Sequence, residues 1–163
     1  MFEIPAIILY AASVVAIAIL VFVVVRSYIK NNPKELPMDE MEGHDFEYYC
    51  ADLLKASGFL EVEVTKGSGD FGADILAEKD GVTYAFQCKC YDKPIGVKAV
   101  MEIYAGRDYY DRMVGVVMTN QYFTQPAVEL AKKLNIMLWD RGYLDNMDSQ
   151  WKRGLGEKDS FNQ

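Results

Sequence analysis

The sequence has few of the side chains that build disulfide scaffolds or zinc sites, since its 163 residues include three cysteines and one histidine. An odd number of cysteines does not indicate a disulfide framework. Cys88 and Cys90 form a single CxC pair, which with the lone His44 falls short of zinc-finger spacing, although Cys50 could complete a ligand set. We therefore expect the cysteines to be small buried apolar side chains, with zinc binding or thiol redox chemistry as the alternative.

Positive charge is also scarce, because 17 lysines and arginines stand against 24 aspartates and glutamates, a net charge of −7. This balance argues against a protein that coats nucleic acid nonspecifically. It does not exclude an enzyme that acts on nucleic acid, because a metal site itself concentrates carboxylates. The sequence has no visible repeat or low-complexity tract, and its length suits one globular domain plus terminal segments.

One segment lacks charge altogether: residues 4–25, IPAIILYAASVVAIAILVFVVV. As a helix this run would be about 33 Å long at about 1.5 Å per residue, enough to cross a hydrocarbon core of about 30 Å. A buried core helix should keep a polar face, and a cleavable signal peptide should have a basic start and a shorter apolar run. We therefore expect residues 1–29 to form an uncleaved, single-pass anchor in the cell membrane.

The charges that flank this run predict its orientation. Glu3 precedes it, whereas Arg26, Lys30 and Lys34 follow it, so the positive-inside bias places the C-terminal domain in the cytoplasm. Residues 30–37, KNNPKELP, are typical of a short linker. The folded domain is then expected over residues 38–145, with residues 146–163 as a polar, loosely ordered tail.

The domain alternates helical and strand-like segments. Residues 38–58 predict a helix, with Asp39 and Glu42 at capping-box spacing and Gly58 ending it in a left-handed conformation. Further segments are predicted as strands at 60–65, 73–79, 82–89, 113–119 and 136–140, and as helices at 97–112 and after Thr124. Strand, helix, strand in the C-terminal half implies at least one parallel crossover. The predicted fold class is therefore α/β with a mixed sheet.

A β-hairpin is the sharpest local prediction in the domain. Asp80 and Gly81 stand between two alternating runs, which favours a two-residue turn. Cross-strand partners then have numbers that sum to 161, so Asp74 faces Gln87, and Lys89 shares their face because side chains repeat every two residues. The opposite face receives side chains that we assign to packing: Tyr84, Phe86, Cys88 and Cys90.

A carboxylate, an amide and a lysine on one face can cooperate in phosphodiester hydrolysis. Carboxylate and amide oxygens hold a hard cation such as Mg²⁺, which polarises the phosphate and lowers the pKa of a bound water. Lysine can orient or deprotonate that water and offset charge on the phosphoryl oxygens. Glu47 could add a second carboxylate if the first helix packs across the hairpin. The alternative is an ordinary polar surface without chemistry.

Five segments of the chain match a known pattern in order and with compatible spacing: HDFEYYCADLLKASGF, GSGDFGADI, FQCKCY, VVMTNQYFTQPAVELAKKL and LWD. Together they closely resemble the Mrr-like restriction endonuclease domain, a branch of the PD-(D/E)xK phosphodiesterase superfamily. The resemblance implies a restriction-endonuclease-like fold, a mixed central sheet flanked by helices, here preceded by one transmembrane helix. It also implies a hydrolase: a deoxyribonuclease that depends on Mg²⁺ (or Mn²⁺) and is similar to type IV restriction endonucleases.

The resemblance implies roles for four residues. Asp74 matches the metal-binding aspartate, and Gln87 takes a position that holds Glu or Asp in most of the superfamily and usually Gln in the Mrr-like branch. Lys89 matches the catalytic lysine, and Glu47 matches a helix glutamate that adds to the site. The implied metal ligands are therefore Asp74, Gln87 and Glu47, with Lys89 assisting the attacking water.

The departure from the family that matters most concerns DNA recognition. The bacterial protein that names the family has a separate DNA-recognition domain, where this chain has a predicted membrane span, so sequence or methylation specificity does not transfer. Contacts to DNA would come from the domain itself, and the candidates are Lys66, Lys93, Lys98, Thr119 and Asn120, joined by Arg107 and Arg112. The alternative function is a noncatalytic nucleic-acid-binding or assembly module, and a homodimer is compatible with either.

Overall fold

The computed structural model describes residues 15, 17–24, 26, 37–66, 69 and 71–160, with the backbone alone for residues 154–160. The chain divides into two units, residues 1–36 and 37–163. In the first unit, residues 17–24 are helical and their side chains are exposed. No helix within the described residues is long and apolar enough to cross a membrane. Most of the predicted span over residues 4–25, and all but the last residue of the predicted linker, lie outside the described residues.

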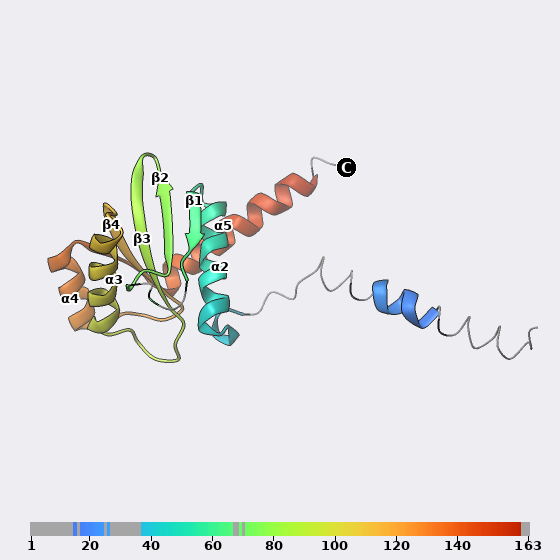
Figure 1. Cartoon of the computed structure of the whole chain (residues 1–163), viewed down its shortest axis with the longest axis horizontal. Helices are drawn as coiled ribbons and strands as arrows, with labels where there is room; N and C mark the ends of the chain where they lie inside the picture. The colour runs from blue at the N-terminus through green and yellow to red at the C-terminus, as the bar shows by residue number, and fades with distance from the viewer. Residues whose placement is uncertain are drawn as a thin grey trace, which may run out of the picture. The chain divides into compact units, whose positions relative to one another are not determined.

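In the described part of the second unit, five strands form one sheet in sequence order (Figure 1). The strands are β1 (Leu60–Val64), β2 (Ile75–Lys79), β3 (Val82–Lys89), β4 (Val114–Thr119) and β5 (Ile136–Trp139). The pairs β1–β2 and β2–β3 are antiparallel, whereas β3–β4 and β4–β5 are parallel. The predicted mixed sheet with parallel crossovers is therefore confirmed.

Helices cover both faces of this sheet (Figure 1). One face carries α2 (Gly43–Ala56) and α5 (Arg141–Ser160), and the other carries α3 (Val97–Tyr109) and α4 (Gln125–Leu134). Alternating side chains of β3 serve the two layers, because Phe86 packs in the core beneath α2 and α5 while Ala85 packs beneath α3 and α4. Burial on both faces explains why β4 is almost continuously apolar.

The hairpin between β2 and β3 has the predicted register. Asp80 and Gly81 both have positive φ, 54° and 75°, as a two-residue turn of this kind requires. Lys79 pairs with Val82, and the same register continues along the strands. Asp74, directly before β2, donates its backbone N–H to the Phe86 carbonyl at 2.7 Å, which brings it beside the end of β3.

Two predictions at the edges of the domain are wrong. Asp39 does not cap the first helix: it lies in the short 3₁₀ turn Met38–Glu40, and α2 begins at Gly43 without a side-chain cap. The expected disorder of residues 146–163 is also not found where the structure describes them, because α5 runs to Ser160. Its first turns bury Leu144 and Met147 in the core, which stabilises the helix there.

Candidate active site

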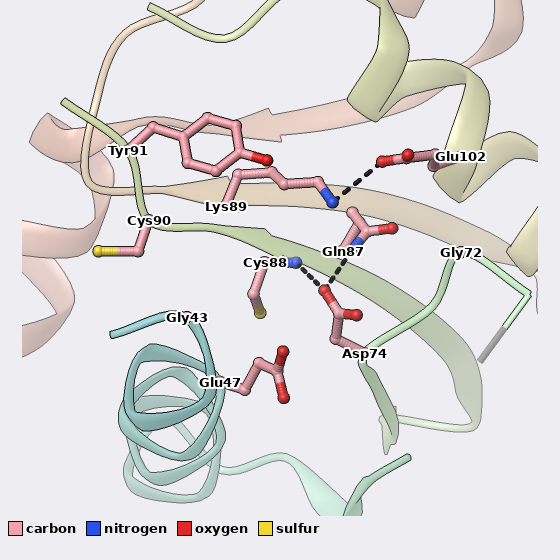
Figure 2. Close-up of a pocket in the computed structure, with 10 residues that line it drawn as sticks. All are labelled: Gly43, Glu47, Gly72, Asp74, Gln87, Cys88, Lys89, Cys90, Tyr91 and Glu102. Atoms are coloured by element: carbon pink, nitrogen blue, oxygen red, sulfur yellow. Dashed lines mark hydrogen bonds and ion pairs between the residues drawn. The ribbon is translucent and has the colours of Figure 1, made fainter. Parts of the chain in front are cut away.

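The residues predicted for chemistry line one cavity of about 370 Å³ at the end of β3 (Figure 2). Asp74 comes from the loop before β2, and Gln87 and Lys89 come from β3. Glu47 reaches the cavity from α2, and Glu102 reaches it from α3, which covers the other face of the sheet. The cavity therefore collects side chains from both layers of the domain.

Asp74 and Gln87 are in direct contact, as the hairpin register predicts. Oδ2 of Asp74 accepts hydrogen bonds from Nε2 of Gln87 and, at 2.6 Å, from the backbone N–H of Cys88. Both side chains are buried, with exposed fractions of 6% for Asp74 and 3% for Gln87. Two donors to one oxygen offset the cost of removing the carboxylate from water.

Lys89 points toward α3, where its Nζ lies 3.0 Å from Oε2 of Glu102. Burial alone would lower the pKa of Lys89, but the close contact with Glu102 and the negative charges of Glu102 and Asp74 outweigh it, so the pKa is raised. Oε1 of Glu102 lies 3.6 Å from Nζ of Lys98, one turn earlier on α3. Glu102 is thus shared by two lysines.

Glu47 approaches from the opposite layer, with its carboxylate turned toward Asp74 (Figure 2). Its side chain is one-fifth exposed, and Oε2 lies 3.0 Å from Nδ1 of His44, on the same helix. The neighbours of Glu47 on α2, Phe46 and Cys50, are fully buried, so packing of the helix holds the carboxylate at the cavity. The first helix therefore does pack across the hairpin, as the sequence prediction of this carboxylate required.

The donors of the cavity fit a hard divalent cation. Carboxylate oxygens of Asp74 and Glu47 and the amide oxygen of Gln87 are the ligand types that Mg²⁺ prefers. No three Asp, Glu, His or Cys side chains among the described residues are arranged to hold a metal ion, so a metal here would need the Gln87 amide. Rotation of that amide exchanges Nε2 for Oε1 beside Asp74, and two oxygens facing each other favour a cation between them.

Two glycines set the distance between Asp74 and α3. Gly72 has φ of 89°, and a Cβ there would overlap the carbonyl group of Glu102. Gly106 lies one turn after Glu102 on α3, and a Cβ there would lie 2.7 Å from the carbonyl carbon of Gly72. The loop before β2 therefore packs directly on the α3 backbone, which places Glu102 at the cavity.

The sequence analysis missed Glu102 as a residue of the cavity. A signal for it exists, because Ala99, Ile103 and Gly106 form the buried stripe of α3 and Glu102 adjoins that stripe. A right-handed crossover between β3 and β4 lays this stripe over the face that carries Lys89. Spacing to Lys98 alone would indicate only an ordinary i, i+4 surface pair.

The residues predicted to contact nucleic acid fall into two groups. Lys66, Lys93 and Lys98 are exposed, and the last two line a hollow that adjoins the cavity at Lys89. Thr119 and Asn120 are buried, so the structure does not bring them to the surface.

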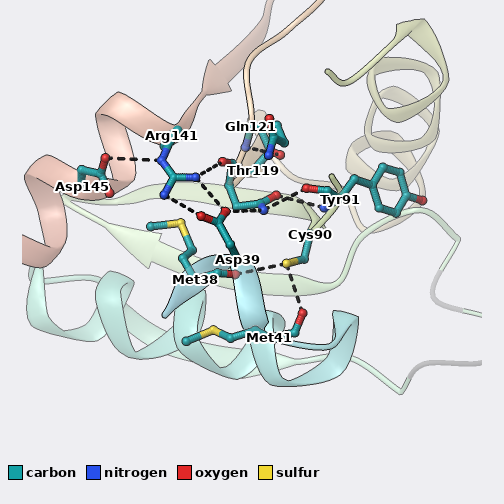
Figure 3. Close-up of polar contacts among 10 residues, drawn as sticks. Met38, Asp39, Met41, Cys90, Tyr91, Thr119, Gln121, Arg141 and Asp145 are labelled. Carbon is teal, nitrogen blue, oxygen red and sulfur yellow. Dashed lines mark hydrogen bonds and ion pairs between the residues drawn. The ribbon is translucent and has the colours of Figure 1, made fainter. Parts of the chain in front are cut away.

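Asn120 instead joins three segments of the domain. Its Oδ1 accepts from the backbone N–H of Tyr91 at 2.9 Å, and its Nδ2 donates to the Tyr91 carbonyl and to Asp39. Asp39 in turn forms a two-pronged contact with Arg141, at 2.7 and 2.8 Å (Figure 3). This network holds the backbone that follows Lys89 in place.

The cysteines pack as predicted. Cys50 and Cys88 are buried in the core between α2 and the sheet. Contact with the Cys50 thiol and burial raise the pKa of the Cys88 thiol well above its usual value, which keeps the thiol protonated. The half-buried Cys90 lies 3.4 and 3.3 Å from the carbonyl oxygens of Met38 and Met41 (Figure 3).

Comparison with known proteins agrees with this architecture. A model of the Mrr_cat family, described as restriction endonuclease, matches residues 38–147. The solved structure of AF1548, a protein of unknown function, is similar at a TM-score of 0.51 and 27% identity, covering 60% of this chain and 57% of that chain. The DNA modification-dependent restriction endonuclease AspBHI is similar at a TM-score of 0.50, with 82% of this chain and 37% of that chain covered. At 19% identity, AspBHI supports the fold alone.

The chain thus spans about half, or less, of the length of these two solved structures. No curated protein matches it.

Proposed function

Because the chain belongs to the Mrr_cat family of restriction endonucleases, we propose that its domain hydrolyses DNA phosphodiester bonds with the help of a divalent metal ion. One observation carries the proposal: Glu47, Asp74, Gln87 and Lys89 line the same cavity although they come from separate elements. A scaffold that had lost catalysis would have no need to keep a lysine beside two carboxylates in one pocket.

In this proposal Asp74, Glu47 and the Gln87 amide oxygen hold Mg²⁺ or Mn²⁺. The bound ion supplies Lewis acidity for the phosphate and lowers the pKa of a water molecule. The protein contributes the geometry: the Cys88 N–H and the strand pairing fix Asp74, and the packed face of α2 fixes Glu47. Pre-positioned ligands lower the cost of ordering the site when substrate binds.

Lys89 acts as a cation in this mechanism. The Glu102 carboxylate, 3.0 Å from its Nζ, favours the charged form of the side chain, which can orient the attacking water. An ammonium group there also offsets the negative charge that develops on the phosphoryl oxygens. Proton acceptance would then fall to the solvent or to a carboxylate of the cavity.

Substrate binding is assigned to exposed lysines around the cavity, chiefly Lys93 and Lys98 and, on the loop after β1, Lys66. Lysines bind phosphates as point charges without reading sequence. The acidic remainder of the domain would repel DNA elsewhere, which confines binding to this side.

We also propose that residues 4–25 anchor the chain in the cell membrane with the domain in the cytoplasm. Support comes from the uncharged apolar run and from the basic residues that follow it, Arg26, Lys30 and Lys34. Membrane fractionation of the full chain tests the anchor, and protease protection of the domain tests its orientation. A homodimer would bring two sites to one DNA duplex. Light scattering in detergent measures whether the chain is a monomer or a dimer.

The test of function is plasmid cleavage by the full chain in detergent with Mg²⁺ or Mn²⁺. Lys89→Ala and Asp74→Asn should each lower the rate by about 10² to 10³, the range for removing one group that stabilises charge. Lys132→Ala and Asp52→Asn, at exposed positions on α4 and α2, are the matched controls. Nicking by both site variants at the wild-type rate would reveal a contaminating nuclease or a wrongly assigned site. Saturable DNA binding without cleavage under any metal condition would favour the noncatalytic module.

A further inference from the structure

Lys89 stands in a cavity that holds several carboxylates, and the ion pair that it forms is with Glu102. Figure 2 shows its ammonium group turned toward α3, whereas Asp74 and Glu47 lie lower in the view. A flexible lysine in such a cavity can pair with any carboxylate within reach. Which carboxylate it selects decides how much negative charge the others keep for a cation.

Glu102 is built into a fixed position. The direct packing of Gly72 on its backbone, and of Gly106 one turn later on the loop, leaves α3 no room to move closer to the loop. The carboxylate is also bracketed, with Lys89 at 3.0 Å from one oxygen and Lys98 at 3.6 Å from the other. The Lys89 pair is partly shielded, with exposed fractions of 19% and 29% for its side chains. Such shielding strengthens the pair relative to one in open solvent.

We propose that Glu102 is a positioning residue of this site, which holds Lys89 on the α3 side of the cavity so that the Asp74 carboxylate stays available to a divalent cation. Without Glu102, Lys89 would turn toward Asp74 and compete with the metal for it. This inference rests on the proposed function for its metal, but it concerns metal binding and can be tested without DNA cleavage.

The probe is Mn²⁺, titrated calorimetrically into the full chain. Glu102→Gln keeps the size of the side chain and removes its charge, and we expect Mn²⁺ to bind about 10- to 100-fold more weakly, the range for outer-shell partners of metal ligands. Asp108→Asn removes one negative charge from an exposed position of the same helix and should leave Mn²⁺ affinity unchanged. Glu102→Asp, which keeps the charge on a shorter side chain, should fall between the wild type and Glu102→Gln.

A double-mutant cycle separates positioning from structural support. In the Lys89→Met background there is no ammonium group to compete for Asp74, so adding Glu102→Gln should no longer weaken Mn²⁺ binding. The double variant should therefore bind Mn²⁺ as the single Lys89→Met variant does. A structural role for Glu102 would give the same loss in both backgrounds.

Three results would overturn the inference: Mn²⁺ affinity of Glu102→Gln within twofold of the wild type, a loss that persists in the Lys89→Met background, or a wild type that does not bind Mn²⁺. Thermal unfolding checks that each variant is folded, and Glu102→Asp carries the cycle if Glu102→Gln does not fold. Cleavage is measured in parallel. If Mn²⁺ binding to the wild type and the variants follows the expected pattern but the wild type leaves plasmid intact, the proposed nuclease is refuted and the role of Glu102 stands.

Discussion

Gln87 stabilises the buried carboxylate of Asp74 through its side-chain amide group. Its Nε2 donates to Oδ2 of Asp74, so a buried amide satisfies a buried carboxylate where a second carboxylate would repel it. The same side chain offers an oxygen after rotation of its amide. A glutamine at this position therefore suits both the buried Asp74 carboxylate and the cation proposed to bind beside it.

The two roles of the Gln87 amide, as a donor to Asp74 and as an oxygen ligand, predict the effect of Gln87→Glu. The variant loses the donor to Asp74 and sets two buried carboxylates side by side, which should lower the free energy of unfolding by about 1 to 3 kcal/mol in EDTA. Mn²⁺ should recover most of that loss, because it binds between the two groups. Urea unfolding with EDTA and with Mn²⁺ measures both effects.

The matched control is Gln125→Glu on α4, which also replaces an amide that donates to a carboxylate, Glu129, but at an exposed position. It should lower the free energy of unfolding by no more than about 0.5 kcal/mol, and by the same amount with or without Mn²⁺. An equal loss of stability for Gln87→Glu in EDTA and in saturating Mn²⁺ would argue against a metal between these side chains.

At the residue scale, the sequence was sufficient to predict the contact between Asp74 and Gln87. The turn at Asp80 and Gly81 fixes the pairing of neighbouring strands, and such local geometry can be counted along the chain. Glu102 could not be placed in this way. Its contact with Lys89 depends on how closely α3 approaches the loop before β2. Gly72 and Gly106, which are far apart in the sequence, decide that distance.

At the scale of elements, the loop before β2 crosses α3 at a close backbone approach beside the site. This approach needs glycine on both sides, at Gly72 and Gly106. A helical glycine usually costs about 1 kcal/mol relative to alanine, so Gly106 gives up helix stability for this approach. The approach joins the Asp74 loop to the helix that carries Glu102.

Gly106→Ala should therefore do the opposite of a normal glycine-to-alanine change in a helix. The added Cβ would meet the Gly72 carbonyl carbon at 2.7 Å and displace the loop that carries Asp74. We expect a loss of about 1 to 3 kcal/mol in unfolding free energy, the usual cost of overpacking, together with weaker Mn²⁺ binding. Thermal unfolding and calorimetry test the two effects.

Gly142→Ala on α5 is the comparison, because a Cβ there meets its nearest atom, Oδ1 of Asp140, at 3.5 Å, an ordinary contact. It should be neutral or stabilise the domain by up to about 1 kcal/mol. If Gly106→Ala behaved in the same way, the crossing would not control the position of the loop.

The sequence predicted most elements of the domain, but the start of the first helix was placed incorrectly and the last helix was not predicted. Asp39 and Glu42 have capping-box spacing, yet Arg141 and Asn120 bind Asp39 instead, and no local pattern reveals partners so distant in sequence. The α5 helix was missed because its composition is polar. Its apolar residues Leu144, Met147 and Trp151 nevertheless recur at helical spacing and pack toward the core, so a weak periodic signal was present.

At the scale of the whole domain, the contact between Asp39 and Arg141 joins its first turn to its last helix. Arg141 binds both oxygens of Asp39, and Asn120 links the pair to the backbone after β3. The linker composition of residues 30–37 predicts that the domain begins at Met38. The contact adds a physical reason, because it fastens residues 38–40 to the fold.

The Asp39 contact predicts how stability depends on pH. Hydrogen bonds from Arg141 and Asn120 hold the pKa of Asp39 below its usual value of 3.8. A carboxyl group with a lowered pKa in the folded state stabilises the protein above its unfolded pKa, and this contribution is lost as the pH falls through the folded pKa. Asp39→Asn should thus lower the unfolding free energy at pH 7 by up to about 1 kcal/mol, since the pair is exposed and screened.

Urea unfolding of the wild type and Asp39→Asn between about pH 7 and pH 2.5 measures this contribution. The two curves should converge as Asp39 of the wild type becomes protonated, at pH values below the usual carboxyl pKa of 3.8. Asp52→Asn provides the reference, because its i, i+3 pair with Lys55 is worth no more than about 0.5 kcal/mol. A gap between the wild type and Asp39→Asn that widened on acidification would mean that the Asp39 carboxylate is not what fastens the first turn to α5. The geometry requires two results. At pH 7, Asp39→Asn should lower the unfolding free energy more than Asp52→Asn does, and at low pH the unfolding free energies of the wild type and Asp39→Asn should become equal.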